Sequence, residues 1–486
     1  MDVLRAQTIS GVKWAYLSNF LVRGIQPLTL AILARLLTPE DFGLMAMALT
    51  ATGFITLFKD LGLGQALIQH RGRTEEVADT VFWLQLLFGI VWFVGIWIAA
   101  PLIGGYYHRE EVISILRTLG VLFLIYPFSD VPLSILVREL EFKALFFRQA
   151  APLLFSSFIS ITLAYIGFGA WALVFGSITG AGATAIIVLW ISEWHPKIRF
   201  KGQILAKLLN FGAHVSVQNI LRWLIVSVDQ VFVGRFLGAH NLGIYRMGFT
   251  LGDMPWSLIS GPFNLVLYPV LCKANSDLSA VKRQYLAAMR WLTLINMPVG
   301  IAVAFLAPSI VSIFLGSKWT QVTPVLQLLA LVGAIASIVT MNPEVYKAIG
   351  RPDVMSKFLL VRAMVSLPSY YFAAQKGVVI LAATHLGLTL IFAPVNALIC
   401  MHVLHINMKE LFLQIRGGIA ISEVFIALGI LYHLGVAKLG IPEPMNGVGL
   451  LGIFLLAGGV ALWYFERVAA QHLVSIINPK SRSMEG

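Results

Sequence analysis

Long apolar stretches recur along this chain and are separated by short polar segments. Stretches such as 81–104 and 448–465 contain no charged residue and are long enough to cross about 30 Å of hydrocarbon as helices. The hydropathy pattern predicts fourteen membrane-spanning helices. Their expected bounds are 14–37, 42–58, 78–104, 112–137, 150–168, 170–192, 208–237, 242–271, 291–316, 322–347, 358–376, 378–402, 415–438 and 448–468. No connecting segment exceeds about twenty residues, which predicts an all-α polytopic membrane protein without a separate soluble domain.

Composition supports this class. Hydrophobic residues make up 58% of the 486 and charged residues only 12%, so a soluble fold would leave far too much apolar surface in water. The first stretch, 14–37, follows two basic residues as a secretory signal would. It is too long for a signal core and contains Arg23, Gln26 and Pro27, so we expect an uncleaved first helix.

The basic residues fall mainly on one side of the predicted membrane. The two termini and the loops after even-numbered spans hold 24 of the 35 lysines and arginines, and the loops after odd-numbered spans hold four. This asymmetry predicts that both termini are cytoplasmic. The net charge of +12 is spread over separate short segments, which argues against a nucleic-acid-binding surface.

An internal repeat appears at an offset of 200 residues. Aligning 19–50 with 219–250 without gaps gives eight identities, including Arg35 with Arg235 and Gly43 with Gly243. The first two spans thereby align with the seventh and eighth. An even number of helices separates the copies, so we predict two parallel six-helix lobes and a C-terminal helix pair, as in transporters that rock around a central site. The predicted divisions are 1–207, 208–405 and 406–486.

Basic residues at an end position of a span, or next to it, are counted with the loops; seven arginines then remain inside the apolar spans, and no lysine joins them. They are Arg23, Arg35, Arg117, Arg222, Arg235, Arg246 and Arg362. A charged residue at the bilayer centre costs roughly 2.5–3.5 kcal/mol on insertion scales, so we expect these side chains to avoid lipid. The planar guanidinium binds phosphate with two hydrogen bonds and keeps its charge, which points to an anionic ligand.

Helical spacing gathers polar residues into stripes on the two repeat-mate spans. The stripes consist of Asn19, Arg23 and Gln26 on the first span, and Asn219, Arg222 and Asp229 on the seventh. Arg23 and Arg222 lie some 20 Å from the periplasmic helix ends at 1.5 Å per residue. We predict that they bind an anionic group in a cavity, with Asn19, Gln26 and Asn219. A structural ion pair, such as Arg222 with Asp229, is the alternative.

The other arginines lie nearer the membrane surfaces. Arg35, Arg117, Arg235 and Arg246 fall within about two turns of the periplasmic face, and Arg362 within about one turn of the cytoplasmic face. We expect a periplasmic rim of four arginines, whose side chains could also simply reach the interface.

Further polar residues line the eighth and tenth spans. They are Asp253, Ser257, Ser260 and Asn264 on the eighth, and Ser337, Thr340, Glu344 and Lys347 on the tenth. We assign these stripes to the bundle interior. Asp229 and Asp253 are candidate sites for a coupling ion or proton.

Metal and cofactor motifs are weak. Cys272 and Cys400 have no zinc or disulfide spacing and are expected to be small buried hydrophobes. The GVGLLG run at 447–452 has the Gly-x-Gly-x-x-Gly spacing but opens an apolar span, which argues against dinucleotide binding. His402 and His405 lack further ligands. We expect no cofactor and no metal.

Several segments are similar to a known family. TISGVKW (8–14), LARLLTPEDFGL (33–44), DLGLGQALIQ (60–69), RELEF (138–142) and GSKWTQVTPVLQLL (316–329) resemble the Wzx-type polysaccharide flippases. The branch that includes the colanic acid exporter, within the multidrug/oligosaccharidyl-lipid/polysaccharide exporter superfamily, is the most similar.

This resemblance implies a non-enzymatic exporter of the bacterial inner membrane. Its cargo would be an undecaprenyl-diphosphate-linked oligosaccharide, moved by alternating access, with a polysaccharide polymerase and co-polymerase of the same pathway as possible partners. Two alternatives stay open. A drug/cation antiporter of the same superfamily would require an acidic cavity, and a membrane-embedded polymerase or ligase would require a large periplasmic loop with catalytic groups.

Overall fold

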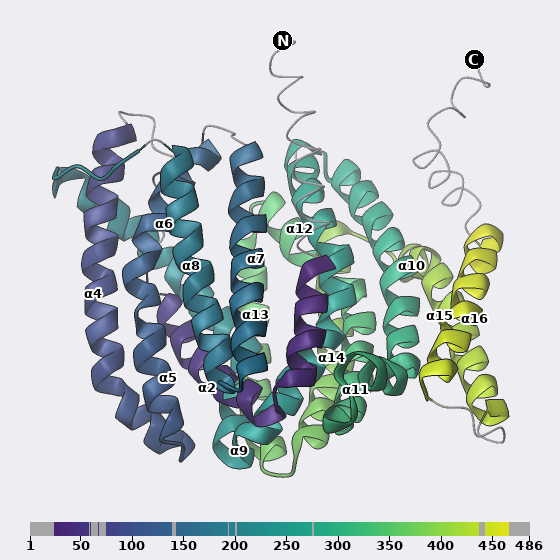
Figure 1. Ribbon diagram of the computed structural model, residues 1–486. Coiled ribbons are helices and arrows are strands. Elements are labelled where there is room, and N and C mark those ends of the chain that lie inside the picture. The colour runs from purple at the N-terminus through teal and green to yellow at the C-terminus, as the bar shows by residue number, and fades with distance from the viewer. Residues whose placement is uncertain are drawn as a thin grey trace. The chain divides into compact units, whose positions relative to one another are not determined.

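The computed structural model describes residues 24–57, 59, 67, 74–138, 142–192, 194–199, 202–274, 277–436 and 443–465. Every regular element within these ranges is a helix (Figure 1), so the fold is all-α, as predicted. Seven of the described helices are long and apolar enough to cross a membrane, and three shorter ones are also apolar. The chain is therefore a multi-pass membrane protein.

Contacts divide the chain into two units between Arg246 and Met247. The first unit begins, in its described part, with a helix at 24–36. Its further helices are α2 (Pro39–Thr56), α4 (Thr74–Tyr107), α5 (Glu111–Gly120), α6 (Leu122–Arg138), α7 (Phe142–Ile166), α8 (Ala170–Ser192) and the first part of α9 (Gly202–Ala274). Within this unit α4, α6 and α8 pack side by side (Figure 1). The predicted lobe boundary at 207 follows the repeat rather than these contacts and stays a prediction.

The LLTPEDFG segment forms the turn before α2 and the first residues of this helix. Thr38 caps the helix: its hydroxyl accepts a hydrogen bond from the amide of Asp41, and the Asp41 carboxylate accepts from the Thr38 amide at 2.9 Å. Pro39 occupies the first turn, where the absence of an amide hydrogen costs nothing. This capping box fixes the start of α2 two residues after the helix at 24–36 ends.

The equivalent turn of the repeat lies inside α9, which is two helices joined at Gly238. Gly238 has φ of 79°, a left-handed conformation that glycine adopts without steric cost. The two repeat-mate turns pack against each other. A Cβ on Gly43 would lie 1.7 Å from the carbonyl oxygen of Ala239, and one on Gly243 would lie 1.8 Å from that of Pro39.

These two contacts are related by the same offset of 200, because Pro39 aligns with Ala239 and Gly43 with Gly243. Each turn thus presents a backbone carbonyl to the other turn's glycine. A reciprocal contact of this kind is what a two-fold relation between the copies requires. The structure therefore supports the repeat in the predicted register at this turn.

The second unit begins in the rest of α9. Its further helices are α10 (Leu278–Ile310), α11 (Val322–Ala336), α12 (Asn342–Ala348), α13 (Pro352–Ala374), α14 (Val378–Leu404), α15 (Met408–Val436) and α16 (Glu443–Phe465). A π-helical turn at Val311–Leu315 ends α10. The last two helices pack on α10, where the rings of Phe425 and Phe454 stack at 4.6 Å.

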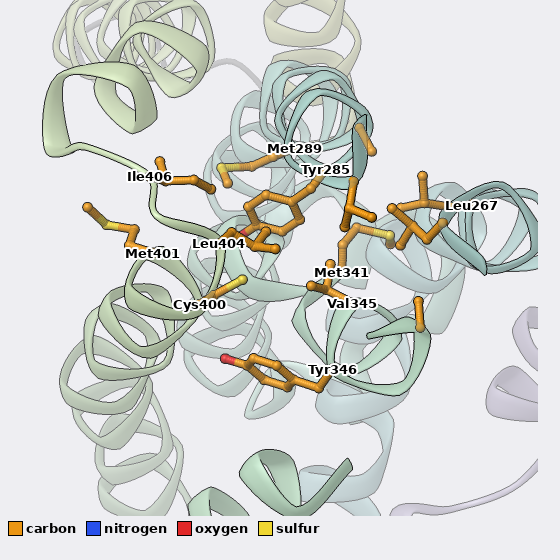
Figure 2. Packing of buried hydrophobic residues seen from close by; sticks show 14 of the residues in the cluster. Leu267, Tyr285, Met289, Met341, Val345, Tyr346, Cys400, Met401, Leu404 and Ile406 are labelled. Carbon is orange, nitrogen blue, oxygen red and sulfur yellow. The ribbon is translucent and has the colours of Figure 1, made fainter. Parts of the chain in front are cut away.

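A buried cluster joins α10, α12 and α14 in this unit. Figure 2 shows Tyr285, Tyr346 and Cys400 among leucine and methionine side chains. Cys400 is fully buried, as predicted, whereas Cys272 is exposed, so the expectation of a buried Cys272 is wrong. The reason is its place near the end of α9, where neighbouring side chains do not cover it.

The outer faces of the helices carry large apolar side chains. Trp190 is 83% exposed, Leu102 77% and Leu456 74%. A water-soluble protein would hide such side chains, whereas a bilayer covers them. Their exposure agrees with the membrane-spanning character of the helices.

Candidate functional site

The predicted arginine stripes lie largely outside the part of the chain that the structure describes. Asn19 and Arg23 precede the first described residue. Gln26 lies at the start of the helix at 24–36 and is exposed. Asn219 and Arg222 lie on the first arm of α9, with side chains outside the description. Their binding role stays a prediction.

Asp229, the third member of the α9 stripe, is fully buried. Its carboxylate accepts a 2.6 Å hydrogen bond from the Tyr245 hydroxyl and a 2.8 Å hydrogen bond from the Gln230 amide. Tyr245 is itself fully buried and lies on the second arm of α9. The bond therefore crosses the hairpin, 16 residues along the chain, and joins its two arms.

Gln230 and Arg246 form a second bridge across the same hairpin. The Arg246 guanidinium donates to the Gln230 side-chain oxygen at 3.1 Å, while Gln230 is 3% exposed. Arg246 also lies near enough to interact electrostatically with Asp229. Four polar residues thus clamp the two arms around Gly238, and this gives Asp229 a structural role whether or not it also binds an ion.

Asp253 lies farther along the second arm of α9 and is half-buried. The stripe predicted around it has members in different surroundings. Ser260 is buried and accepts a 3.3 Å hydrogen bond from the Asn296 amide, whereas Ser257 is exposed and bonds to the carbonyl of Met254 in its own helix. Asn264 lies outside the described side chains. Asp229 and Asp253 fall in different contact units, and their coupling role stays a prediction.

Besides Arg246, two more arginines of the predicted periplasmic rim make defined contacts. Arg235 donates a 2.7 Å hydrogen bond to the carbonyl oxygen of Tyr106 and contacts the His108 ring. The Arg117 guanidinium lies 4.8 Å from the centre of the Trp97 ring, and its Nε is buried without a hydrogen bond to a described residue. Such a cation–π contact stabilises a partly desolvated arginine. Arg35 is exposed on the last turn of its helix.

Arg362 lies farther from the start of its helix than from the start of its predicted span, while its depth in the membrane stays a prediction. The expectation placed it about one turn from the cytoplasmic end of its span, but α13 begins at Pro352, ten residues earlier. At 1.5 Å per residue this is roughly 15 Å. The difference arises because the first turns of α13 carry Asp353 and Lys357, which lower hydropathy without ending a helix.

Of the polar residues predicted to line the tenth span, Thr340 contacts another helix and Ser337 bonds within its own segment. The Trp256 indole donates to Thr340 at 3.0 Å, and the Ser337 hydroxyl bonds to the carbonyl of Ala334 in the preceding turn. Beside them, buried Asn342 accepts from Tyr285 at 2.8 Å and donates to the carbonyl of Asn396 at 3.0 Å. The predicted interior location holds for Ser337, which is buried.

Glu344 and Lys347 form an ion pair of neighbouring turns at 3.0 Å, with the lysine half exposed. These two residues therefore satisfy each other at the edge of the second unit. They do not extend the buried network of Asn342.

Sequence reasoning missed a charged pair in the first unit. Lys59, counted as a loop residue, forms a 2.7 Å ion pair with Asp130 of α6. The side chains of Lys59 and Asp130 line a pocket in this unit, and Gln85 of α4 also lines it. A signal was available, because Gln85 and Asp130 are polar residues within the predicted spans 78–104 and 112–137.

Several known proteins are similar to this chain in sequence or in fold. The Bacillus subtilis (strain 168) teichuronic acid biosynthesis protein TuaB is 28% identical over 447 residues, which cover 89% of each chain. The Escherichia coli (strain K12) lipopolysaccharide biosynthesis protein WzxC is 23% identical over 374 residues, 76% of each chain. Among solved structures, the lipid II flippase MurJ in an inward closed conformation aligns with a TM-score of 0.74 at 13% identity, over 94% of this chain and 99% of that one.

The MurJ likeness concerns the fold, and the sequence matches concern the family. The family model described as polysaccharide biosynthesis protein matches residues 32–324, which include most of the motifs behind the resemblance. That resemblance to the Wzx-type proteins is confirmed. On this match, the chain belongs to the polysaccharide biosynthesis protein family.

Proposed function

We propose that this protein is a flippase that carries an undecaprenyl-diphosphate-linked oligosaccharide across the bacterial inner membrane. The observation that carries the proposal is the pair of mid-membrane arginines, Arg23 and Arg222, on repeat-mate helices of a polysaccharide biosynthesis protein. A diphosphate is the anionic part of such a cargo, and guanidinium groups bind it with paired, charge-assisted hydrogen bonds. The similarity in fold to MurJ, which is described as a lipid II flippase, supports the same function.

In this proposal the cargo enters from the cytoplasm with its lipid tail in the bilayer. Both termini are cytoplasmic, on the basis of the basic residues in the even-numbered loops. Arg23 and Arg222, with Asn19, Gln26 and Asn219, hold the diphosphate. Alternating access then exposes the sugars on the far side. Asp229 or Asp253 takes up a proton or cation and resets the cavity, and the protein needs no enzymatic step.

The test is complementation in a host that lacks its own exporter. Arg23→Ala and Arg222→Ala are each expected to abolish polysaccharide export at normal protein level. The lysine variants at the same positions keep the charge but lose the planar fork, so partial export is expected. Arg35→Ala is the matched control, because Arg35 lies exposed at a helix end. Full export by both well-expressed alanine variants would show that the arginines do not form the binding site.

A further inference from the structure

The end of α4 packs tightly against the first arm of α9. A Cβ on Gly234 would lie 2.8 Å from the Tyr107 ring, and Tyr107 is 5% exposed. Both segments belong to the first contact unit, yet the predicted boundary at 207 places α4 in one lobe and this arm in the other. In the predicted orientation both segments end at the periplasmic face, because they correspond to odd-numbered spans. The contact therefore joins the predicted lobes on the periplasmic side.

Arg235 strengthens this junction by contacting three groups of the segment 106–108. One terminal nitrogen of its guanidinium donates a 2.7 Å hydrogen bond to the Tyr106 carbonyl oxygen and also contacts Nε2 of His108. The guanidinium carbon lies 5.3 Å from the centre of the Tyr106 ring. A terminal guanidinium nitrogen carries two hydrogens, so it can donate to both acceptors at once. We call these three contacts the periplasmic clasp.

The clasp requires a neutral His108. Arginine has only donors, so the His108 ring must accept through the lone pair of Nε2 and carry its proton on Nδ1. A second proton would turn Nε2 into a donor and place two cations in contact. Histidine is the side chain that ordinarily changes charge between pH 5 and 8. Protonation in this range would therefore break the contact with Arg235.

The other charged groups around this turn offer the imidazole little compensation. Arg109 is the next residue in the chain; it pairs with Glu40 of α2 at 2.8 Å and lies 4.0 Å from Glu111 of α5. These two carboxylates are thus already engaged by a cation. Glu110 and His240 are exposed, where water and salt screen their charges. The guanidinium in direct contact therefore dominates the electrostatics of the imidazole.

His108 is accessible to protons and is held in place by its backbone. It directly follows the membrane-spanning segment Glu75–Tyr107 and is exposed, so water reaches it. Its φ of 54° is left-handed, which among the described non-glycine residues is shared only by His405. Two amide-to-carbonyl hydrogen bonds of 3.2 and 3.0 Å close this end of α4. Such a backbone conformation persists where the surrounding structure holds it.

We propose that the periplasmic clasp is proton-sensitive: it holds the end of α4 on α9 at neutral pH and releases it when His108 is protonated. This inference rests on the proposed function, because alternating access requires the predicted lobes to separate on the periplasmic side for the cargo to leave. Acidification of the periplasmic side would thus favour the state that releases cargo. This effect is separate from any ion bound at Asp229 or Asp253.

The distance between two spin labels follows the clasp in the purified full chain in lipid nanodiscs. The labels are attached at Gly105→Cys and His240→Cys, one on each helix, in a Cys272→Ser background; Cys400 is fully buried and does not react. A Cβ at position 105 meets nothing within 4 Å, and His240 is exposed. Lowering the pH from about 7.5 to about 5.5 is expected to raise the ratio of long to short distances about tenfold.

Two variants remove the titrating group by different means. His108→Gln keeps a neutral acceptor of similar reach, and His108→Asn suits the left-handed backbone; in each, the distance ratio is expected to be the same at both pH values. Arg235→Met removes the clasp itself and should give the higher ratio already at neutral pH. His405→Gln is the matched control, because His405 is exposed and has φ of 50° but lies in the second unit. It should keep the wild-type response to pH.

Translocation of the undecaprenyl-diphosphate-linked repeat unit in liposomes separates the two proposals. A wild-type distance ratio that does not change with pH overturns the proton-sensitive clasp, and so does a pH response that persists in both His108 variants. If the repeat unit is still translocated, the proposed function stands without the clasp. A pH response that both His108 variants lose, without translocation of the repeat unit, supports the proton-sensitive contact and overturns the proposed function.

Discussion

Gly43→Ala tests whether the repeat-mate turns pack as tightly as the structure indicates. The new Cβ would lie 1.7 Å from the Ala239 carbonyl oxygen, and real Cβ atoms essentially never come within 3.0 Å of a neighbour. The two turns would have to separate by at least 1.3 Å, the difference between these distances. Overpacking typically costs about 1–3 kcal/mol, and here the obstacle is backbone that cannot rotate away. We expect a loss of stability at or above the upper end of this range.

The assay is the melting temperature of the detergent-solubilised protein, measured by heating and size-exclusion chromatography. Gly243→Ala should cause a loss of similar size, because its Cβ would lie 1.8 Å from the Pro39 carbonyl oxygen. Gly95→Ala is the control, since nothing lies within 4 Å of its Cβ position. There the change should be neutral or slightly stabilising.

The double variant gives a sharper result. Once the first alanine has separated the turns, the second costs little, so the two losses are expected to be less than additive. If the Gly43→Ala protein has the same melting temperature as the Gly95→Ala control, the close contact between the turns is refuted. Strict additivity of two large losses would refute the reciprocal arrangement.

Three further predictions concern single contacts, each measured by the same melting assay. Tyr245→Phe removes the donor to buried Asp229 and should lower stability by about 1.5–3 kcal/mol, the range for a hydrogen bond to a charged group; an unchanged melting temperature would show that the bond does not hold the hairpin. Asn342→Leu breaks two buried hydrogen bonds and should destabilise the protein by at least about 1–3 kcal/mol; an unchanged melting temperature would show that these hydrogen bonds do not stabilise the fold. Arg117→Met removes the cation from the face of Trp97 and should cost about 0.5–2 kcal/mol, in contrast to no change if the arginine merely reaches the membrane surface.

Hydropathy predicted the presence and order of the helices better than their ends. The described helices fall on the predicted spans, but α10 begins at Leu278 rather than 291, and α15 at Met408 rather than 415. The early turns of α10 contain Lys282 and Arg283, which are unsuited to lipid yet fully compatible with a helix. Hydropathy reports the surroundings of a segment, whereas backbone hydrogen bonding sets the helix bounds.

The pairing of polar residues could not be read from spacing alone. Helical periodicity placed Asp229 on one helix face with Arg222. In the structure, the Asp229 carboxylate accepts a hydrogen bond from the hydroxyl of Tyr245, which lies on the other arm of a hairpin. Lys59 and Asp130 are 71 residues apart and meet only because α2 and α6 belong to one bundle. Such pairs depend on tertiary packing, for which a single sequence carries little signal. The repeat was the exception, since its register predicted which glycines are equivalent.

Translocation by the purified protein in liposomes tests the central claim most directly. The undecaprenyl-diphosphate-linked repeat unit would be placed in one leaflet, and its arrival in the other followed with a membrane-impermeant lectin. The account predicts that wild-type protein accelerates arrival far above that in protein-free liposomes, and that Arg222→Ala abolishes this acceleration while Arg35→Ala retains it. Transfer at the protein-free rate by correctly folded wild-type protein would contradict the account.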